Sequence, residues 1–368
     1  EYARRQLQGK VIGVTGSAGK TSTVAMMNQV LSHFGTCYST QSNANLPMGI
    51  AWNLANAPWN SEFVVLEMAI GRMRINSRVA RPHVAVVTNI GHAHLEFHHS
   101  LEQIAQRKAR IFESLVQGGY AVINRDTECF ELLNKAANQR GLSVYTFGRH
   151  AASDVQLLGD GTAGNRFQVC IQQQVYALPV AALAEHMAAN FLACLAVVQC
   201  LGLNVATAIE RFDQFVPVPG RGSEFTAEVS GKQVRIIDES YNANPVSMAA
   251  SLQYLGVLFQ QGVYKRKIML LGDMLELGEN TLDYHADLAT VVTEQNPDLL
   301  LLCGPKMRHL AAQLPIQSTG RLISLEDAEA ALNRLPDLLS DGDLVLVKSS
   351  HGTGLHKVVA ELRRGSGV

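Results

Sequence analysis

The stretch VIGVTGSAGKTST, residues 11–23, decides how the first half of this chain folds. A short β-branched strand runs into a turn that contains Gly16 and Gly19, and Lys20 and Thr21 then open a predicted helix. The glycines let backbone N–H groups approach phosphate oxygens, the helix N-terminus adds a favourable dipole, and the lysine adds positive charge. The threonine hydroxyl is suited to Mg²⁺. The pattern predicts a nucleotide phosphate loop; the alternative is an ordinary strand, turn and helix whose lysine is solvated.

The loop is a variant of the general P-loop pattern. That pattern has a glycine five positions before the Gly-Lys pair. Val14 stands there instead, which leaves the form TGxxGKT. The residues of this segment predicted to bind nucleotide are Gly16, Ser17, Gly19, Lys20, Thr21 and Ser22.

Composition limits the classes of function. At 368 residues the chain exceeds what one core usually serves, so we expect two domains. Apolar residues make up 47% and charged residues 17%, as in an ordered α/β protein. A net charge of -1 without any Lys/Arg run argues against nucleic acid as a partner. We therefore expect small-molecule substrates and a monomer.

Cysteine usage and the N-terminus bear on the compartment. The six cysteines have neither metal-ligand spacing nor the density of a disulfide scaffold, so we expect a cytoplasmic protein. No apolar stretch is long enough to span a bilayer, and no signal peptide is recognisable. The sequence starts at Glu1 without an initiator methionine, and we expect that an upstream portion is missing.

Strand-like apolar runs alternate with helical patterns through most of the chain. Such alternation predicts parallel sheets covered by helices, and continuous apolar runs are typical of strands buried on both faces. In the first half the predicted strands are 11–15, 63–68, 83–90 and 120–124, with helices at about 21–34, 101–115 and 184–200. The segment 154–179 alternates between polar and apolar residues, which predicts a small antiparallel excursion.

The stretch VPVPGRG at 216–222 is the strongest break in the pattern, because its prolines and glycines cannot continue a helix or a central strand. Beyond it, strand-like runs resume at 234–240, 267–273, 299–304 and 343–350. The predicted fold class is α/β: a P-loop-type, mostly parallel sheet ATPase domain at 1–218, followed by a smaller doubly wound, Rossmann-like domain at 219–368.

Polar residues at strand ends mark candidate sites, because ligands of open α/β sheets bind at the carboxyl ends of the strands. Glu67 could bind the Mg²⁺ of a nucleotide, or be a solvated acid. Lys108 reads by itself as part of a solvated basic face. The loop after the third strand holds a group of histidines suited to metal or phosphate: His92, His94, His98 and His99.

The second domain repeats this arrangement. Its strand ends carry the polar segments DESYNANP (238–245), LGDMLELG (271–278) and KSSHGTG (348–354). Asn242 and Asn244 could contact a base or ribose, or form a plain Asn/Pro turn. Lys348 and Ser349 stand where an anion or carboxylate site would lie.

The order of these motifs resembles that of the Mur ligases over nearly the whole chain. The segments that carry the resemblance are TGSAGKTS, SNAN, LEM, TNIGHAHLE, the helix with Lys108, HMAAN, PGRG, DESYNANP, LGDMLELG and KSSHGTG. DESYNANP and LGDMLELG point to the branch that joins D-alanyl-D-alanine to UDP-N-acetylmuramoyl-tripeptide. The resemblance implies ADP-forming amide ligation through an acyl phosphate, in peptidoglycan synthesis.

The resemblance also implies roles for single residues. Lys20 would bind the β and γ phosphates of ATP. Two Mg²⁺ ions would be served by Thr21, Glu67, His94 and a carbamylated Lys108. Further nucleotide contacts would be Asn190, Arg221, Asp238, Tyr241, Asn242 and Asn244. Residues facing the substrates would be Asn43, Asn45, Lys348, Ser349 and His351.

Two departures leave the substrates open. The family's first domain, which holds the UDP end of the acceptor, would precede Glu1, and His351 replaces a family arginine. A second hypothesis is therefore a two-domain Mur-like ligase of another pathway, joining an amino acid or amine to a carboxylate without UDP. A third is an ATP-binding scaffold with a retired site, against which the intact Lys20, Glu67 and Lys108 argue.

Overall fold

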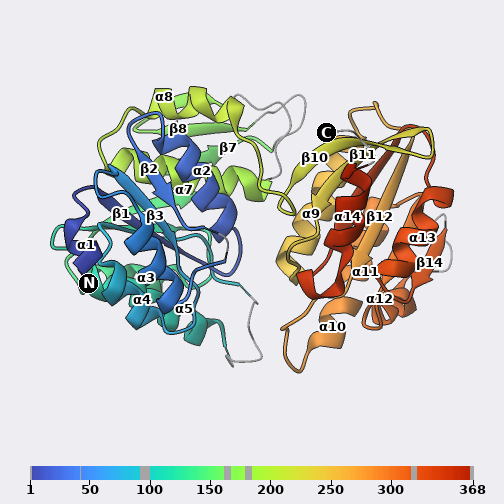
Figure 1. Ribbon diagram of the computed structural model, residues 1–368, viewed down its shortest axis with the longest axis horizontal. Coiled ribbons are helices and arrows are strands. Elements are labelled where there is room, and N and C mark those ends of the chain that lie inside the picture. The colour runs from blue at the N-terminus through green and yellow to red at the C-terminus, as the bar shows by residue number, and fades with distance from the viewer. Residues whose placement is uncertain are drawn as a thin grey trace. The chain divides into compact units, whose positions relative to one another are not determined.

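The computed structural model describes residues 2–41, 43–91, 100–160, 167–178, 185–315 and 321–364. They form two compact α/β units, which divide between Phe215 and Val216 (Figure 1). None of the described helices combines the length and the apolar character needed to cross a bilayer. The predicted α/β class is confirmed in both units, each of which is built on its own largely parallel sheet.

The described part of the first unit is built on one sheet, with the strand order β2-β3-β1-β4-β5-β6-β7-β8-β9. From β2 to β7 each neighbouring pair is parallel, and β8 and β9 add an antiparallel hairpin at one edge. The predicted antiparallel excursion is thus confirmed. The strands are β1 (Lys10–Thr15), β2 (Cys37–Ser39), β3 (Phe63–Glu67), β4 (Val84–Val87), β5 (Tyr120–Asn124), β6 (Ser143–Gly148), β7 (Val155–Leu158), β8 (Gln168–Ile171) and β9 (Gln174–Ala177).

Helices cover this sheet on both faces. In one layer α2 packs against α7, and in the other α4 packs against α3 and the 3₁₀ helix η2. The helices are α1 (Tyr2–Gln6), α2 (Lys20–Leu31), α3 (Pro47–Asn56), α4 (Met73–Ala80), α5 (Leu101–Ala109), η2 (Arg110–Ser114), α6 (Phe130–Asn138), α7 (Glu185–Cys200), α8 (Val205–Glu210) and η3 (Arg211–Gln214). The single helix predicted at 101–115 is therefore an α-helix that tightens into a 3₁₀ turn, as helix ends often do.

The second unit holds a sheet with the order β10-β11-β15-β12-β13-β14, parallel except for β10. Its strands are β10 (Ser223–Val229), β11 (Lys232–Glu239), β12 (Arg266–Gly272), β13 (Leu299–Cys303), β14 (Leu322–Leu325) and β15 (Asp343–Lys348). Its helices are α9 (Pro245–Phe259), α10 (Thr281–Ala286), α11 (Leu288–Gln295), α12 (Met307–Gln313), α13 (Ala328–Leu338), η4 (His351–Thr353) and α14 (Leu355–Arg364). The doubly wound prediction is confirmed, and β10 and β14 are additions to it.

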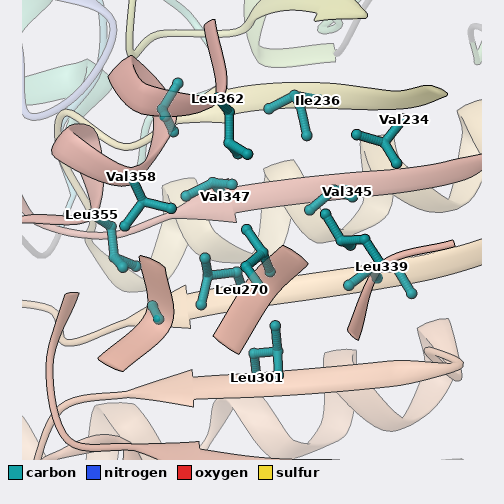
Figure 2. Packing of buried hydrophobic residues seen from close by; sticks show 14 of the residues in the cluster. Val234, Ile236, Leu270, Leu301, Leu339, Val345, Val347, Leu355, Val358 and Leu362 are labelled. Carbon is teal, nitrogen blue, oxygen red and sulfur yellow. The ribbon is translucent and has the colours of Figure 1, made fainter. Parts of the chain in front are cut away.

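One hydrophobic cluster of the second unit lies between this sheet and the pair α13 and α14. Figure 2 shows Leu355, Val358 and Leu362 of α14 on the side of Ile236 and Val347 in the sheet. All five are at most 7% exposed, and burying each such side chain contributes about 1.5 to 3 kcal/mol. The packing fixes the strand ends from which the polar loops of this unit emerge.

Candidate active site

The phosphate loop joins β1 to α2, and both of its glycines are required by close neighbours. Gly19 adopts φ +78°, and a Cβ there would lie 2.2 Å from Oδ1 of Asn190 on α7. A Cβ on Gly16 would lie 1.8 Å from Oγ1 of Thr88, just after β4. A side chain at either position would force the loop or the contacting side chain to shift, because neither contact leaves room for a carbon atom.

Thr88 and Asn89, which directly follow β4, form hydrogen bonds with the phosphate loop. The Ser17 N–H donates to the Asn89 carbonyl at 3.1 Å, and the Ala18 N–H donates to Asn89 Oδ1 at 2.8 Å. The Thr88 hydroxyl donates to the Ala18 carbonyl at 2.6 Å. Sequence reasoning did not assign Thr88 or Asn89 to the site, although their position as polar residues directly after a buried strand was a usable signal.

Three side chains from separate segments converge beside the loop. The Thr21 hydroxyl donates to Glu67 Oε2 at 2.6 Å, and the Asn45 amide donates to Glu67 Oε1 at 3.0 Å. Glu67 ends β3 and is 4% exposed, so it is not a solvated acid. Carboxylate and hydroxyl oxygens are the ligands that Mg²⁺ prefers, so this donor set fits that ion. Ser22, by contrast, is buried in the first turn of α2.

Two lysines lie near this group. Lys20 Nζ donates to the Gly16 carbonyl at 2.9 Å, so its side chain folds back over the loop. Lys108 on α5 is 1% exposed, whereas its neighbour Arg107 is exposed, so the solvated basic face does not include this lysine. Burial, and then the charge of Lys20, hold the pKa of Lys108 well below its usual value. The structure therefore favours a neutral amine at this position.

Two predicted site residues, His94 and Asn43, are not among the described side chains that converge beside the loop. His94, with the other three histidines of its loop, lies outside the described residues. Asn43 is exposed, and its carbonyl accepts from the Asn45 N–H at 2.8 Å. Within the described ranges no group of three His, Cys, Asp or Glu side chains could hold a metal ion by itself.

In the second unit, Asp238 is a buried clamp. Its Oδ2 accepts from the Gly220 N–H at 2.8 Å, and its Oδ1 accepts from the Ser240 hydroxyl at 2.6 Å. The Tyr241 N–H donates back to the Gly220 carbonyl at 3.2 Å. Asp238 is 3% exposed. Hydrogen bonds through Asp238 of β11 thus connect the PGRG turn to the start of the 240–244 segment.

Next to these hydrogen bonds, four planar side chains lie in contact with one another: Arg221, Tyr241, His351 and His356. The Arg221 guanidinium lies 4.3 Å from the centre of the Tyr241 ring, which is a cation–π distance. The Tyr241 ring is 5.2 Å from that of His351, and His351 stacks on His356 at 4.0 Å. Tyr241 and the two histidines line a cavity of about 550 Å³ within this unit, which also reaches Arg363 on α14.

The remaining residues of the second unit are mainly structural. Asn244 caps α9, because its side chain accepts from the Ser247 N–H while the Ser247 hydroxyl accepts from the Asn244 N–H. Asn242 is exposed. Lys348 and Ser349 are buried, at 1% and 0% exposure, so neither side chain faces solvent.

Comparison with known proteins agrees with this architecture. The Mur ligase middle domain matches residues 14–198, and the domain described as Mur ligase, glutamate ligase domain matches residues 223–351. The chain therefore belongs to the Mur ligase family. It is similar to the UDP-N-acetylmuramoyl-tripeptide--D-alanyl-D-alanine ligase of Bacillus subtilis (strain 168), with 30% identity over 362 residues, which span 97% of this chain and 77% of that protein.

Two solved structures extend the likeness. The crystal structure of MurF from Acinetobacter baumannii has a TM-score of 0.84 at 26% identity, covering 99% of this chain and 78% of that one. The MurF ligase from Thermotoga maritima, in complex with ADP, has a TM-score of 0.82 at 25% identity, covering 99% and 82%.

Proposed function

We propose that this chain is an ATP-dependent, ADP-forming ligase that joins D-alanyl-D-alanine to UDP-N-acetylmuramoyl-tripeptide in peptidoglycan synthesis. The observation that carries the proposal is the meeting of Thr21, Glu67 and Asn45 beside a phosphate loop. The similarity to ligases of that name, over 97% of the chain in the Bacillus subtilis relative, supports the choice of substrates.

The nucleotide half of the proposal uses the first unit. Because Asn89 holds the N–H groups of Ser17 and Ala18, the phosphates of ATP would meet the N–H groups that follow, at the first turn of α2. Lys20 would neutralise the β and γ phosphates. The Thr21 hydroxyl and the Glu67 carboxylate would hold Mg²⁺, which supplies charge neutralisation at the transferred phosphoryl group.

Lys108 is proposed as the residue that becomes carbamylated. Its nitrogen is neutral when its pKa is low, and a neutral amine can attack CO₂ while losing a proton to form a carbamate. The product replaces a neutral amine with an anion, which the positive charge of Lys20 then attracts. His94 is proposed beside it as a second metal ligand.

The chemistry then needs no protein nucleophile. A carboxylate oxygen of the tripeptide attacks the γ phosphorus and ADP leaves; the amine of the dipeptide attacks the acyl carbon, loses a proton, and phosphate leaves. Loop N–H groups and cations stabilise the charge that develops. We propose Asn190, Arg221, Asp238, Tyr241, Asn242 and Asn244 as residues that contact or position the nucleotide, and Asn43, Asn45, Ser349 and His351 as residues near the substrates.

The proposal extends to the organisation of the protein. The functional domains would be 1–218 and 219–368, close to the division between the compact units at Phe215 and Val216. We propose a monomer in the cytoplasm, where both substrates and ATP would be present.

The test is ADP release by the purified protein with Mg²⁺ and bicarbonate. We expect turnover only when UDP-N-acetylmuramoyl-tripeptide and D-alanyl-D-alanine are both present, with a new amide detected by mass spectrometry. Turnover with free amino acids and simple carboxylates, but not with this pair, would instead identify a Mur-like ligase of another pathway.

A further inference from the structure

The last residue of β15 carries an ammonium group that lies inside the protein. Lys348 is 1% exposed, and its Nζ lies 3.3 Å from Oε2 of Glu239, whose side chain is 12% exposed. Lys348 and Glu239 are direct neighbours in the register of the parallel strands β15 and β11. The two charges are thus paired at the carboxyl end of the sheet, where the loops of the site begin.

The same ammonium reaches beyond the strand. Lys348 Nζ also donates to the backbone carbonyl of Asn242 at 3.2 Å. Two residues later, the Ser350 hydroxyl lies 3.4 Å from the carbonyl of Ala243. Consecutive carbonyls of the 240–244 segment are therefore held from the end of β15.

The end of β15 is tied to a second loop as well. Ser350 Oγ accepts from the Leu275 N–H at 2.9 Å, and the Ser350 N–H donates to the Asp273 carbonyl at 3.2 Å. Asp273 in turn accepts from the Met307 N–H at the start of α12 at 3.0 Å. One strand end therefore fixes both the 240–244 segment and the LGDMLELG loop.

Burying an ion pair costs desolvation that its attraction often fails to recover, so such a pair is better explained by the geometry it enforces than by stability. We infer that Lys348 is a positioning residue: it sets the backbone of the 240–244 segment, and through it the ring of Tyr241 and the amide of Asn242. The kinetic consequence of this assignment rests on the proposed function, whereas the hydrogen bond from Lys348 to Asn242 does not.

The kinetic consequence is a split between binding and turnover. In Lys348→Met the Asn242 carbonyl loses its charged donor, and hydrogen bonds to charged groups are worth enough to change affinity about tenfold or more. We expect the KM for ATP to rise about tenfold, while kcat at saturating ATP stays within about threefold of wild type. Lys357→Met, which removes an exposed lysine from α14, should change neither constant.

A second variant separates positioning from stability. Lys348→Met/Glu239→Leu also removes the carboxylate whose charge Lys348 neutralises, so the thermal midpoint should recover toward wild type. The KM for ATP should stay raised, because the Asn242 carbonyl still lacks its donor. If KM recovered together with the midpoint, the effect of Lys348 would be general stability and the inference would be wrong.

Hydrogen exchange tests, without any substrate, whether Lys348 holds the 240–244 segment in place through the Asn242 carbonyl. Backbone amides of residues 241–244 should exchange about tenfold faster or more in both Lys348 variants, and at the wild-type rate in Lys357→Met. Unchanged exchange, with a raised KM for the amine substrate alone, would show that Lys348 contacts substrate and would overturn the inference. If the wild-type protein ligates nothing, the proposed function fails, and the exchange result still stands.

Discussion

Glu67 is a nearly buried carboxylate whose two oxygens accept from different side chains, Thr21 and Asn45. A Glu67→Gln substitution keeps the size of the side chain and removes its charge. We expect kcat for ADP release to fall by about 100-fold or more. Mg²⁺ would lose a carboxylate ligand, so the negative charge that develops on the phosphoryl group would be stabilised less.

The matched control for Glu67→Gln is Glu128→Gln, which removes an exposed carboxylate from the same unit. Steady-state kinetics with both substrates and Mg²⁺ measures the difference. Equal rates in Glu67→Gln and wild type would remove this carboxylate from the proposed mechanism.

Lys108 is the second residue whose chemistry follows from its surroundings. Because burial lowers its pKa, its amine is neutral at pH values where a solvated lysine is charged, and carbamylation becomes favourable. With ¹³C-bicarbonate we expect a carbamate carbon signal in the wild-type protein, and its loss in Lys108→Met.

Lys135→Met is the control for this signal, because Lys135 is an exposed lysine on α6. It should retain both the carbamate signal and the activity. Removal of CO₂ from the buffer should lower ADP release by the wild-type enzyme, and a rate that is independent of bicarbonate would argue against the modification.

At the scale of the element, the strand–loop–helix unit β1–α2 depends on a glycine that packs against another helix. Gly19→Ala would place a methyl group 2.2 Å from Asn190 Oδ1 and force a left-handed φ that costs about 1 kcal/mol. We expect ADP affinity, measured by calorimetric titration, to fall about tenfold or more because the loop or the Asn190 side chain must move.

Gly118→Ala distinguishes the clash from backbone strain. Gly118 has a similar φ of +71°, but a Cβ there would meet nothing within 4 Å. This variant should lose a comparable amount of stability from strain while keeping the ADP affinity of wild type. Equal losses of affinity in the two variants would mean that contact with Asn190 is not what shapes the loop.

At the scale of the whole molecule, each unit contains a histidine whose pKa is lowered by burial: His83 is half-buried and His285 is fully buried. In the first unit His83 Nδ1 accepts from the Val11 N–H at 2.9 Å, and burial, followed by the charges of Arg4 and Lys10, lowers its pKa to about 4. In the second, His285 Nε2 accepts from a backbone N–H at 2.9 Å, and burial lowers its pKa too.

The sign of the pH effect follows from linkage. The unfolded chain binds a proton at His83 near pH 6.5 and the folded chain only near pH 4, so this stabilisation is complete above pH 6.5 and is lost as pH falls toward 4. We expect the urea midpoint of the first unit to fall between pH 7 and pH 5. In His83→Gln this fall should be smaller.

Tryptophan fluorescence suits this measurement, because both tryptophans of the chain, Trp52 and Trp59, lie in the first unit. His33→Gln, which removes an exposed histidine from the same unit, should show the pH dependence of wild type. An unchanged slope in His83→Gln would show that other groups govern acid stability.

The sequence by itself determined the alternation of strands and helices. Continuous apolar runs predicted β1, β3, β4, β5, β11, β12, β13 and β15, because strands buried on both faces are mostly apolar along their length. The strands β2, β6, β10 and β14 escaped prediction, since each is only partly buried and gives a weak local signal. The phosphate loop was readable because its chemistry is local: glycines, lysine and threonine act within one turn of chain.

Only the tertiary structure decided which polar residues meet. Lys108 read by itself as a solvated cation, and its burial depends on the layers that pack over α5 rather than on its neighbours in sequence. Asn89 and Thr88 reach the loop across 70 residues or more of sequence, and Lys348 reaches Asn242 across 106. Side-chain charge and hydrogen-bonding capacity are written in the sequence, but burial and partnership are properties of distance in space, which the chain acquires when its sheets form.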